Sequence, residues 1–177
     1  SDLKEGNNAV GVVLGNGRFY TMRQDYKPYK ITNFGYPKVR MNIIIEYTDG
    51  TKETVGTNNT WKLTADGSVR SNNEYDGEEY DARKELTGWA TVGYDDSDWK
   101  PAERTSIPLG TLRAQMMPGM KVVEKISPVG IKPLGDKFIL DMGQNMAGWL
   151  RIRVKGSRGD SIRLRFAETL QDNGELF

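Results

Sequence analysis

The stretch Val39-Arg-Met-Asn-Ile-Ile-Ile-Glu-Tyr47 decides the fold class of this chain. Its odd-numbered residues are apolar, and Arg40, Asn42 and Glu46 lie between them, which is the pattern of a β-strand with one buried face. Asp49-Gly50 follows almost directly, and a second strand-like run covers residues 51–55. Asp-Gly between two such runs predicts a β-hairpin closed by a type I′ turn.

The same alternation returns in the second half of the chain. Residues 137–142 alternate, and residues 149–154 and 162–166 each place apolar side chains on one face and arginines on the other. Residues 121–126 have the composition of an extended segment, and no long amphipathic helix is found. The sequence therefore predicts an all-β chain, an antiparallel β-sandwich or jelly roll, with the beginning of a second β-sandwich at the C-terminus.

Two domains are expected. Acidic residues outnumber basic ones up to about residue 104 and basic residues dominate after it, while Pro101 and Pro108 bracket the change. We predict a jelly-roll domain at 1–104, a linker at 105–111 and a partial second β-sandwich at 112–177. Two strands joined by one hairpin do not close a core, so we expect the chain to be a fragment of a longer protein.

The composition excludes several classes of function. The net charge is +1, from 25 basic and 24 acidic residues, whereas proteins that follow nucleic-acid phosphates are strongly basic. No apolar run approaches the ~20 residues of a membrane span. The chain has no cysteine and no histidine, which excludes disulfides, thiol nucleophiles and catalytic triads with a histidine base. We expect neither a nucleic acid nor a membrane as partner.

Five carboxylates crowd into the eight residues from Glu74 to Asp81, with tyrosines between them and Arg83 close by. Three interpretations remain open. The segment is a solvated acidic loop with an Asp–Arg bridge, or it binds a sugar or a hard cation such as calcium, which prefers oxygen ligands. The third is glycoside hydrolysis by paired carboxyls. That reaction needs one carboxyl with a raised pKa, and nothing in this segment singles one out.

Two further turns carry side chains suited to ligand binding. Asp95-Asp-Ser-Asp-Trp99 combines carboxylates with an indole, which either pins the loop to the sheet or stacks on a sugar ring. Gly15-Asn-Gly-Arg-Phe-Tyr20 is a turn that offers an amide and two aromatic rings. The pattern favours a structural turn with core aromatics over a phosphate cradle, because no helix follows it and no phosphate-binding motif is present.

The order of these motifs carries a resemblance. Tyr75-Asp-Gly-Glu-x-Tyr-Asp-Ala-Arg83, Gly88-Trp89, Asp95-Asp-Ser-x-Trp99 and Asp141-x-Gly-Gln-Asn-x-Ala-Gly-Trp149 follow one another as in the N-terminal half of bacterial α-L-rhamnosidases, which the chain resembles over nearly its whole length. The resemblance implies a jelly-roll accessory domain, which in some members binds rhamnose with calcium, followed by a β-sandwich. The hydrolytic carboxylates of that family lie in a later (α/α) barrel.

We therefore expect a noncatalytic part of a glycoside hydrolase that is inactive alone. The predicted sugar contacts are Asn16, Asp76, Glu78, Trp89 and Trp99, and the predicted calcium ligands are Asp81 and Asp96. The expected partners are a rhamnose-containing glycan and the catalytic domain of the same polypeptide, in a protein located outside the cell or in the periplasm. The alternative is a purely structural β-sandwich module that braces the catalytic domain and has no ligand of its own.

Overall fold

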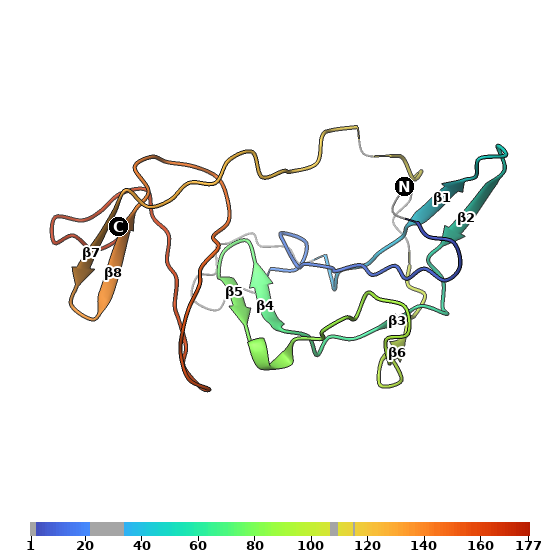
Figure 1. The fold of residues 1–177 in the computed structure, drawn as a ribbon, viewed down its shortest axis with the longest axis horizontal. Helices are drawn as coiled ribbons and strands as arrows, with labels where there is room; N and C mark the ends of the chain where they lie inside the picture. The colour runs from blue at the N-terminus through green and yellow to red at the C-terminus, as the bar shows by residue number, and fades with distance from the viewer. Residues whose placement is uncertain (1–2, 22–33, 107–109, 115) are drawn as a thin grey trace. The chain divides into compact units, whose positions relative to one another are not determined.

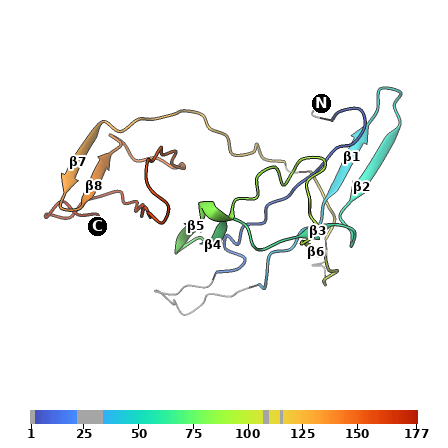
Figure 2. The same cartoon turned by 60° about the horizontal axis from the view of Figure 1, so that its bottom comes forward.

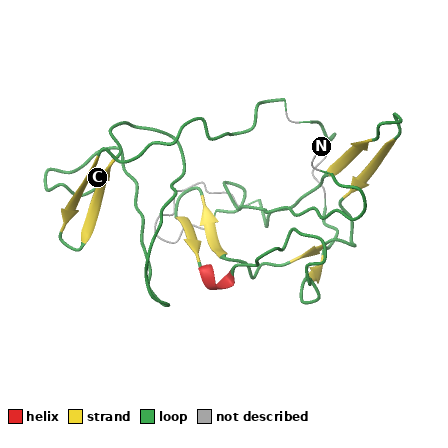
Figure 3. Cartoon of the chain, in the orientation of Figure 1, coloured by secondary structure: helices red, strands yellow, loops and turns green. Residues whose placement is uncertain are grey.

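The structure, a computed structural model, describes residues 3–21, 34–106, 110–114 and 116–177. Within them every sheet is an antiparallel pair of strands, and the single helical element is one 3-10 turn, η1 (Ala82–Lys84). Figures 1 and 3 show these short strands joined by long loops. The all-β prediction is confirmed. None of the described segments forms a helix with the length and apolar character that crossing a membrane requires.

The chain divides into two compact units, Ser1–Ala114 and Gln115–Phe177. The first unit contains three strand pairs. β1 (Asn42–Glu46) pairs with β2 (Lys52–Gly56) from Asn42↔Gly56 to Glu46↔Lys52. Ile43 and Ile45 are half-buried while their neighbours are exposed. The two faces of β1 therefore differ in burial in the way that the sequence alternation predicted.

The turn of the β1–β2 hairpin differs from the predicted type I′ turn. A type I′ turn needs positive φ at both central residues, but only Gly50 has a positive φ here, 83°. The Gly50 amide donates to the Tyr47 carbonyl over 3.0 Å, and the Asp49 carboxylate accepts from the Thr51 amide over 2.9 Å. Because the Asp49 side chain accepts from the backbone two residues ahead, Asp49 keeps a negative φ. The turn is therefore one residue longer than a type I′ turn.

The second hairpin consists of β4 (Val69–Asn73) and β5 (Gly77–Tyr80), and η1 follows β5 directly, as Figure 2 shows. Its register shifts between Val69 and Ser71. The third pair is short: β3 (Lys62–Leu63) meets β6 (Lys100–Pro101), and the Ala102 amide donates to the Trp61 carbonyl over 2.8 Å. This pair closes a loop that contains the second hairpin and the tryptophan-bearing turns.

In the second unit, β7 (Gly130–Leu134) and β8 (Lys137–Asp141) form a regular hairpin without a register shift. Leu170 and Leu176 form an isolated bridge. The strands expected at 149–154 and 162–166 are absent, since these described residues lie outside every strand and are exposed. Their alternation gives each segment an apolar face, but a strand also needs a partner for its amides and carbonyls.

The described residues contain no buried hydrophobic side chain, and Thr21 is the one residue among them that is fully buried. Antiparallel pairing is thus observed, while the two packed layers of a sandwich or jelly roll stay a prediction. An isolated two-stranded hairpin is only marginally stable in water. The order of the first unit therefore depends on the side-chain contacts between its hairpins and loops.

Candidate functional site

The acidic motif forms the tip of the β4–β5 hairpin. Asn73, the last residue of β4, accepts the Tyr75 and Asp76 amides on its side-chain oxygen, each over 2.8 Å, and its side-chain nitrogen donates to the Asp76 carboxylate over 2.9 Å. Gly77 closes the turn with φ of 81°, a left-handed conformation that favours glycine. The sequence folds here because an asparagine side chain substitutes for missing backbone partners. Asp76 is thereby fixed at the exposed tip.

A turn from the N-terminal segment docks on this hairpin. The Asn16 carbonyl accepts the Phe19 and Tyr20 amides, both over 3.1 Å, and the Asn16 amide donates to the side-chain oxygen of Asn72 over 2.9 Å. Asn72 stands opposite Glu78 in the ladder, and directly paired residues place their side chains on the same face. The turn at Asn16 and the carboxylate of Glu78 therefore share one face of the hairpin, although they are distant in sequence.

Arg18 strengthens the same junction. Its Nη1 donates to both carboxylate oxygens of Glu74, over 3.3 and 3.2 Å, and to the Tyr75 hydroxyl over 3.2 Å. Tyr75 and Glu74, in that order, raise the pKa of the Arg18 guanidinium. The Arg18 side chain is 75% exposed, so this ion pair stabilises the junction only modestly. Its main effect is to fix the direction in which the turn leaves the hairpin.

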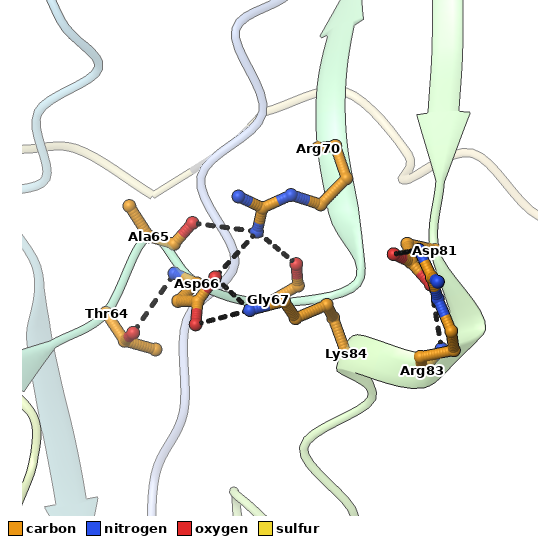
Figure 4. Close-up of polar contacts among 8 residues, drawn as sticks. All are labelled: Thr64, Ala65, Asp66, Gly67, Arg70, Asp81, Arg83 and Lys84. Atoms are coloured by element: carbon orange, nitrogen blue, oxygen red, sulfur yellow. Dashed lines mark hydrogen bonds and ion pairs between the residues drawn. The ribbon is translucent and has the colours of Figure 1, made fainter.

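The base of the hairpin holds a second group of charges, which Figure 4 shows. Asp81 caps η1 and accepts three hydrogen bonds from Arg83: from its amide over 3.0 Å, from Nε over 2.8 Å and from Nη2 over 2.7 Å. The hydrogen bonds from the Arg83 side chain and amide lower the pKa of Asp81 from 3.8 to about 2. Both oxygens of this carboxylate are engaged.

Asp66 organises the loop before β4. Its carboxylate accepts from Lys84 Nζ over 2.9 Å at each oxygen and from Arg70 Nη1 over 3.1 Å. Arg70 Nη1 also donates to the carbonyls of Ala65 and Gly67, as drawn in Figure 4. The hydrogen bond from Lys84 is the largest cause of the lowered pKa of Asp66. These contacts tie η1 to the loop that leads into the hairpin.

The two predicted tryptophans lie together, away from these contacts. Trp89 and Trp99 stack with ring centroids 6.4 Å apart, and Tyr94 meets Trp99 edge-on at 5.8 Å. A side chain at Gly11 would collide with the Trp89 ring, so the backbone passes directly against the indole. Both indoles are half-buried. This arrangement corresponds to the packing alternative for the tryptophan turns.

Asp96 lies beside the same aromatic group and is paired with a lysine. Lys62 Nζ donates to the Asp96 carboxylate over 2.6 Å and to its carbonyl over 3.2 Å. The predicted calcium ligands Asp81 and Asp96 are therefore each occupied by a different basic side chain. No group of three or more Asp or Glu residues converges on one point among the described residues. As arranged, these carboxylates do not fit a calcium ion, which takes six to eight oxygens.

Of the predicted sugar contacts, the structure thus brings Asn16, Asp76 and Glu78 to one hairpin and packs Trp89 against Trp99. Sequence reasoning missed Asn72 and the contact between Arg18 and Glu74, which join residues 56 positions apart. The Asn72-Asn73 doublet before a turn was the available signal, since asparagines there bond neighbouring backbone groups. No local pattern in the sequence indicated that the turn at Asn16 would contact this hairpin.

Comparisons with known proteins bear on the whole chain. A family profile described as the α-L-rhamnosidase N-terminal domain matches residues 1–124, and one described as the bacterial α-L-rhamnosidase concanavalin-like domain matches residues 132–177. An α-L-rhamnosidase of Formosa agariphila is 36% identical over 97% of this chain, and one of Alteromonas sp. is 34% identical over 93%.

A solved structure agrees with these matches. The α-L-rhamnosidase from Dictyoglumus thermophilum aligns with a TM-score of 0.56 and 33% identity, over 62% of this chain and 12% of that chain. The present chain spans only 18% of the length of each of the two relatives named above. On the profile that covers more than half of its residues, the chain belongs to the α-L-rhamnosidase family, in which it corresponds to the N-terminal domain and part of the concanavalin-like domain.

Proposed function

We propose that the first unit binds an L-rhamnose unit of a glycan, as an accessory domain of a larger α-L-rhamnosidase. The observation that carries the proposal is the docking of the Asn16 turn on the β4–β5 hairpin. It places the Asn16 turn on the hairpin face that carries Glu78, and the exposed Asp76 lies at the tip of the same hairpin. Several convergent polar groups are what a ring with many hydroxyls needs for recognition. The names of the relatives supply the sugar.

Titration calorimetry of the 177-residue chain with L-rhamnose tests this proposal. Asp76→Asn and Glu78→Gln each remove a charged acceptor while keeping the shape of the side chain. We expect each to weaken binding about tenfold, because hydrogen bonds to charged groups contribute about 1.5–3 kcal/mol. Glu79→Gln is the matched control, since Glu79 lies one position further along β5 and points to the opposite face. A loss in Glu79→Gln equal to that in Glu78→Gln would contradict the assignment of the face.

The carboxylates predicted to hold calcium are paired with Arg83 and Lys62. The proposed rhamnose site does not depend on calcium. The same titration in calcium and in chelator is expected to give affinities within about twofold, since a cation would have to displace those partners. A much larger difference in affinity would indicate that calcium takes part in binding. Asp81→Asn and Asp96→Asn would then show which of the two carboxylates binds the calcium ion.

We propose further that glycoside hydrolysis is not performed by this chain. The carboxyl groups with a shifted pKa among the described residues are all shifted downward by hydrogen bonds: Asp49, Asp66, Asp81 and Asp95. A general acid needs a carboxyl that stays protonated near neutral pH. An assay with an aryl α-L-rhamnoside is expected to give no turnover above buffer. Turnover that Glu78→Gln abolishes would overturn this part of the proposal.

One observation favours the second candidate, a bracing module without a ligand. The described part of the second unit exposes large apolar side chains throughout, among them Phe138, Trp149 and Phe166. Extensive exposed apolar surface is typical of protein–protein contact. If bracing is the only role, no sugar will bind, and Asp76→Ala and Trp99→Ala will lower the melting temperature equally with and without L-rhamnose.

A further inference from the structure

We propose that four aromatic side chains beside the Asn16 turn form a stacking platform, so that the site takes a carbohydrate chain of several rings. This platform consists of Phe19, Tyr20, Phe34 and Tyr36. The inference rests on the proposed rhamnose-binding function and extends it from one sugar unit to an oligosaccharide.

The four rings form two pairs, each joining a ring of the Asn16 turn to a ring of the segment that begins at Phe34. Phe19 and Phe34 lie with ring centroids 5.5 Å apart and planes inclined by 34°, and Tyr20 and Tyr36 lie 4.9 Å apart at 33°. The Phe34 amide donates to the Phe19 carbonyl over 2.9 Å, which holds the two segments side by side. A hydrogen bond to Tyr36 is the largest cause of the raised pKa of Tyr20. The two hydroxyl groups therefore meet at one end of the platform.

The outer rings of the platform are open to solvent. Phe34 is 60% exposed and Tyr36 is 74% exposed, whereas Tyr20 is half-buried. Lys38 Nζ lies 5.5 Å from the centroid of the Phe19 ring, a distance at which a cation interacts with a ring face. Phe34 and Tyr36 are therefore the most exposed rings of the platform.

The chemistry of this platform suits a sugar ring. A pyranose has an apolar face of C–H groups and a rim of hydroxyls, so it packs on an aromatic face while its rim forms hydrogen bonds. Tyrosine provides a ring and a hydroxyl together, and the ammonium of Lys38 adds donors next to Phe19. A purely apolar partner would leave these polar groups without partners, which has a cost in free energy.

The platform and the polar hairpin are joined by a single turn. Asn16 contacts Asn72 of β4 through its amide and holds Phe19 and Tyr20 through its carbonyl. Arg18, between them, binds Glu74 and Tyr75 of the hairpin tip. One carbohydrate chain can therefore place one ring at the hairpin and the next on the aromatic faces. The geometry favours an oligosaccharide over a free monosaccharide.

The test compares two probes, L-rhamnose and an oligosaccharide of four linked L-rhamnose units, by titration calorimetry with the 177-residue chain. We expect the oligosaccharide to bind more tightly than the monosaccharide. Phe34→Ala and Tyr36→Ala should each weaken oligosaccharide binding about tenfold and leave L-rhamnose binding within about twofold. Phe138→Ala, which removes an aromatic ring of the second unit that is 67% exposed, is the control and should change neither.

The outcomes separate the platform from the proposed function. If Asp76→Asn abolishes binding of both probes while Phe34→Ala and Tyr36→Ala change neither, the rhamnose site stands and the platform is wrong. If the unaltered chain binds neither probe, both are wrong. Tyr36→Trp keeps an aromatic face and should restore oligosaccharide affinity, and saturation-transfer NMR should show contact between tyrosine and phenylalanine protons and the oligosaccharide. Loss of affinity in Tyr36→Trp equal to that in Tyr36→Ala would also overturn the platform.

Discussion

The β4–β5 and β7–β8 hairpins have similar lengths and the same antiparallel pairing, but their surroundings differ. The first hairpin receives Asn16 and Arg18 from a distant turn and is bound at its base through Asp66 and Lys84. The second is joined to a distant described segment by an exposed ion pair, Lys137 with Glu175 at 3.4 Å. Neither hairpin covers a buried core in the described residues. The comparison teaches that polar side-chain contacts and aromatic pairs, more than strand pairing, organise the first unit.

The stacked tryptophans give the largest expected effect. Trp89→Ala removes the ring that packs on Trp99 and against the backbone at Gly11. We expect it to lower the free energy of unfolding of the first unit by about 2–3 kcal/mol, below the usual loss for truncating a large aromatic side chain because the indole is only half-buried. Urea unfolding followed by circular dichroism measures the change.

Its control lies in the other unit. Trp149 is 68% exposed, so Trp149→Ala should change the free energy of unfolding by less than about 0.5 kcal/mol. Equal decreases in the free energy of unfolding in Trp89→Ala and Trp149→Ala would contradict the proposal that aromatic packing stabilises the first unit and not the second.

Glycine at the hairpin tip gives a smaller effect. Gly77 has φ of 81°, and a side chain in this left-handed region costs about 1–2 kcal/mol. Gly77→Ala should therefore destabilise the β4–β5 hairpin by about that amount and weaken L-rhamnose binding, because Asp76 precedes this residue. Gly110→Ala is the control, since Gly110 has no positive φ and open space around it. Similar stabilities of the two variants would argue against the observed turn.

The pH dependence of stability tests the contact between Asp81 and Arg83. The pKa of Asp81 falls from 3.8 to about 2 in the folded chain, so the ionised carboxylate stabilises the fold at every pH above its unfolded value. That stabilisation is lost as pH decreases from about 3.8 through about 2. Melting temperatures at pH 6, 4 and 2.5 measure the effect, at values chosen to span this window.

Asp81→Asn is the comparison variant for this pH series. It should melt lower than the unaltered chain at pH 6, and the difference should shrink toward pH 2.5. Asp49, Asp66 and Asp95 also have lowered pKa values, so both proteins will lose stability in acid. A constant difference between them across the series would show that the Asp81 charge is not linked to folding.

The exposed ion pairs give the smallest effect and sharpen the comparison of the two hairpins. Arg18→Ala removes three hydrogen bonds that hold the docked turn, whereas Lys137→Ala removes one at 3.4 Å. Because both pairs are exposed, we expect Arg18→Ala to lower the free energy of unfolding by about 0.5–1 kcal/mol and Lys137→Ala to lower it by about 0–0.3 kcal/mol. Thermal unfolding at low and high salt measures both. A larger loss of stability in Lys137→Ala than in Arg18→Ala would contradict the conclusion that side-chain contacts stabilise the β4–β5 hairpin more than the β7–β8 hairpin.

Local features of the fold were readable from the sequence. The alternation around Ile43 and Ile45 predicted β1 and its orientation, and Asp49-Gly50 predicted the hairpin, because these signals depend on neighbouring residues. The predicted turn type was wrong because the Asp49 carboxylate accepts the Thr51 amide, and the Asp49 backbone does not have the positive φ that a type I′ turn requires. The strand prediction for residues 149–154 and 162–166 was wrong because alternation does not supply a pairing partner.

The candidate site was readable only in part. The acidic motif and Asn16 were identified as polar turns, and the asparagine-rich turn before Gly77 explains why they fold locally. Their meeting depends on Asn72 and Arg18, whose contacts close long loops with no periodic signal. The aromatic pairs of Phe19 and Tyr20 likewise join segments that the sequence separates. Which distant groups meet is decided by tertiary contacts, and composition does not contain that information.

The register shift beside Arg70 also affects how readily another chain could add a strand to this hairpin. A two-stranded ribbon has two free edges, and a flat free edge recruits any extended peptide that reaches it. The irregular step between Val69 and Ser71 twists the outer edge of β4. The β7 edge is regular but contains Pro133, which has no amide hydrogen to offer. Each ribbon thus carries a different safeguard against intermolecular strand addition during synthesis and storage.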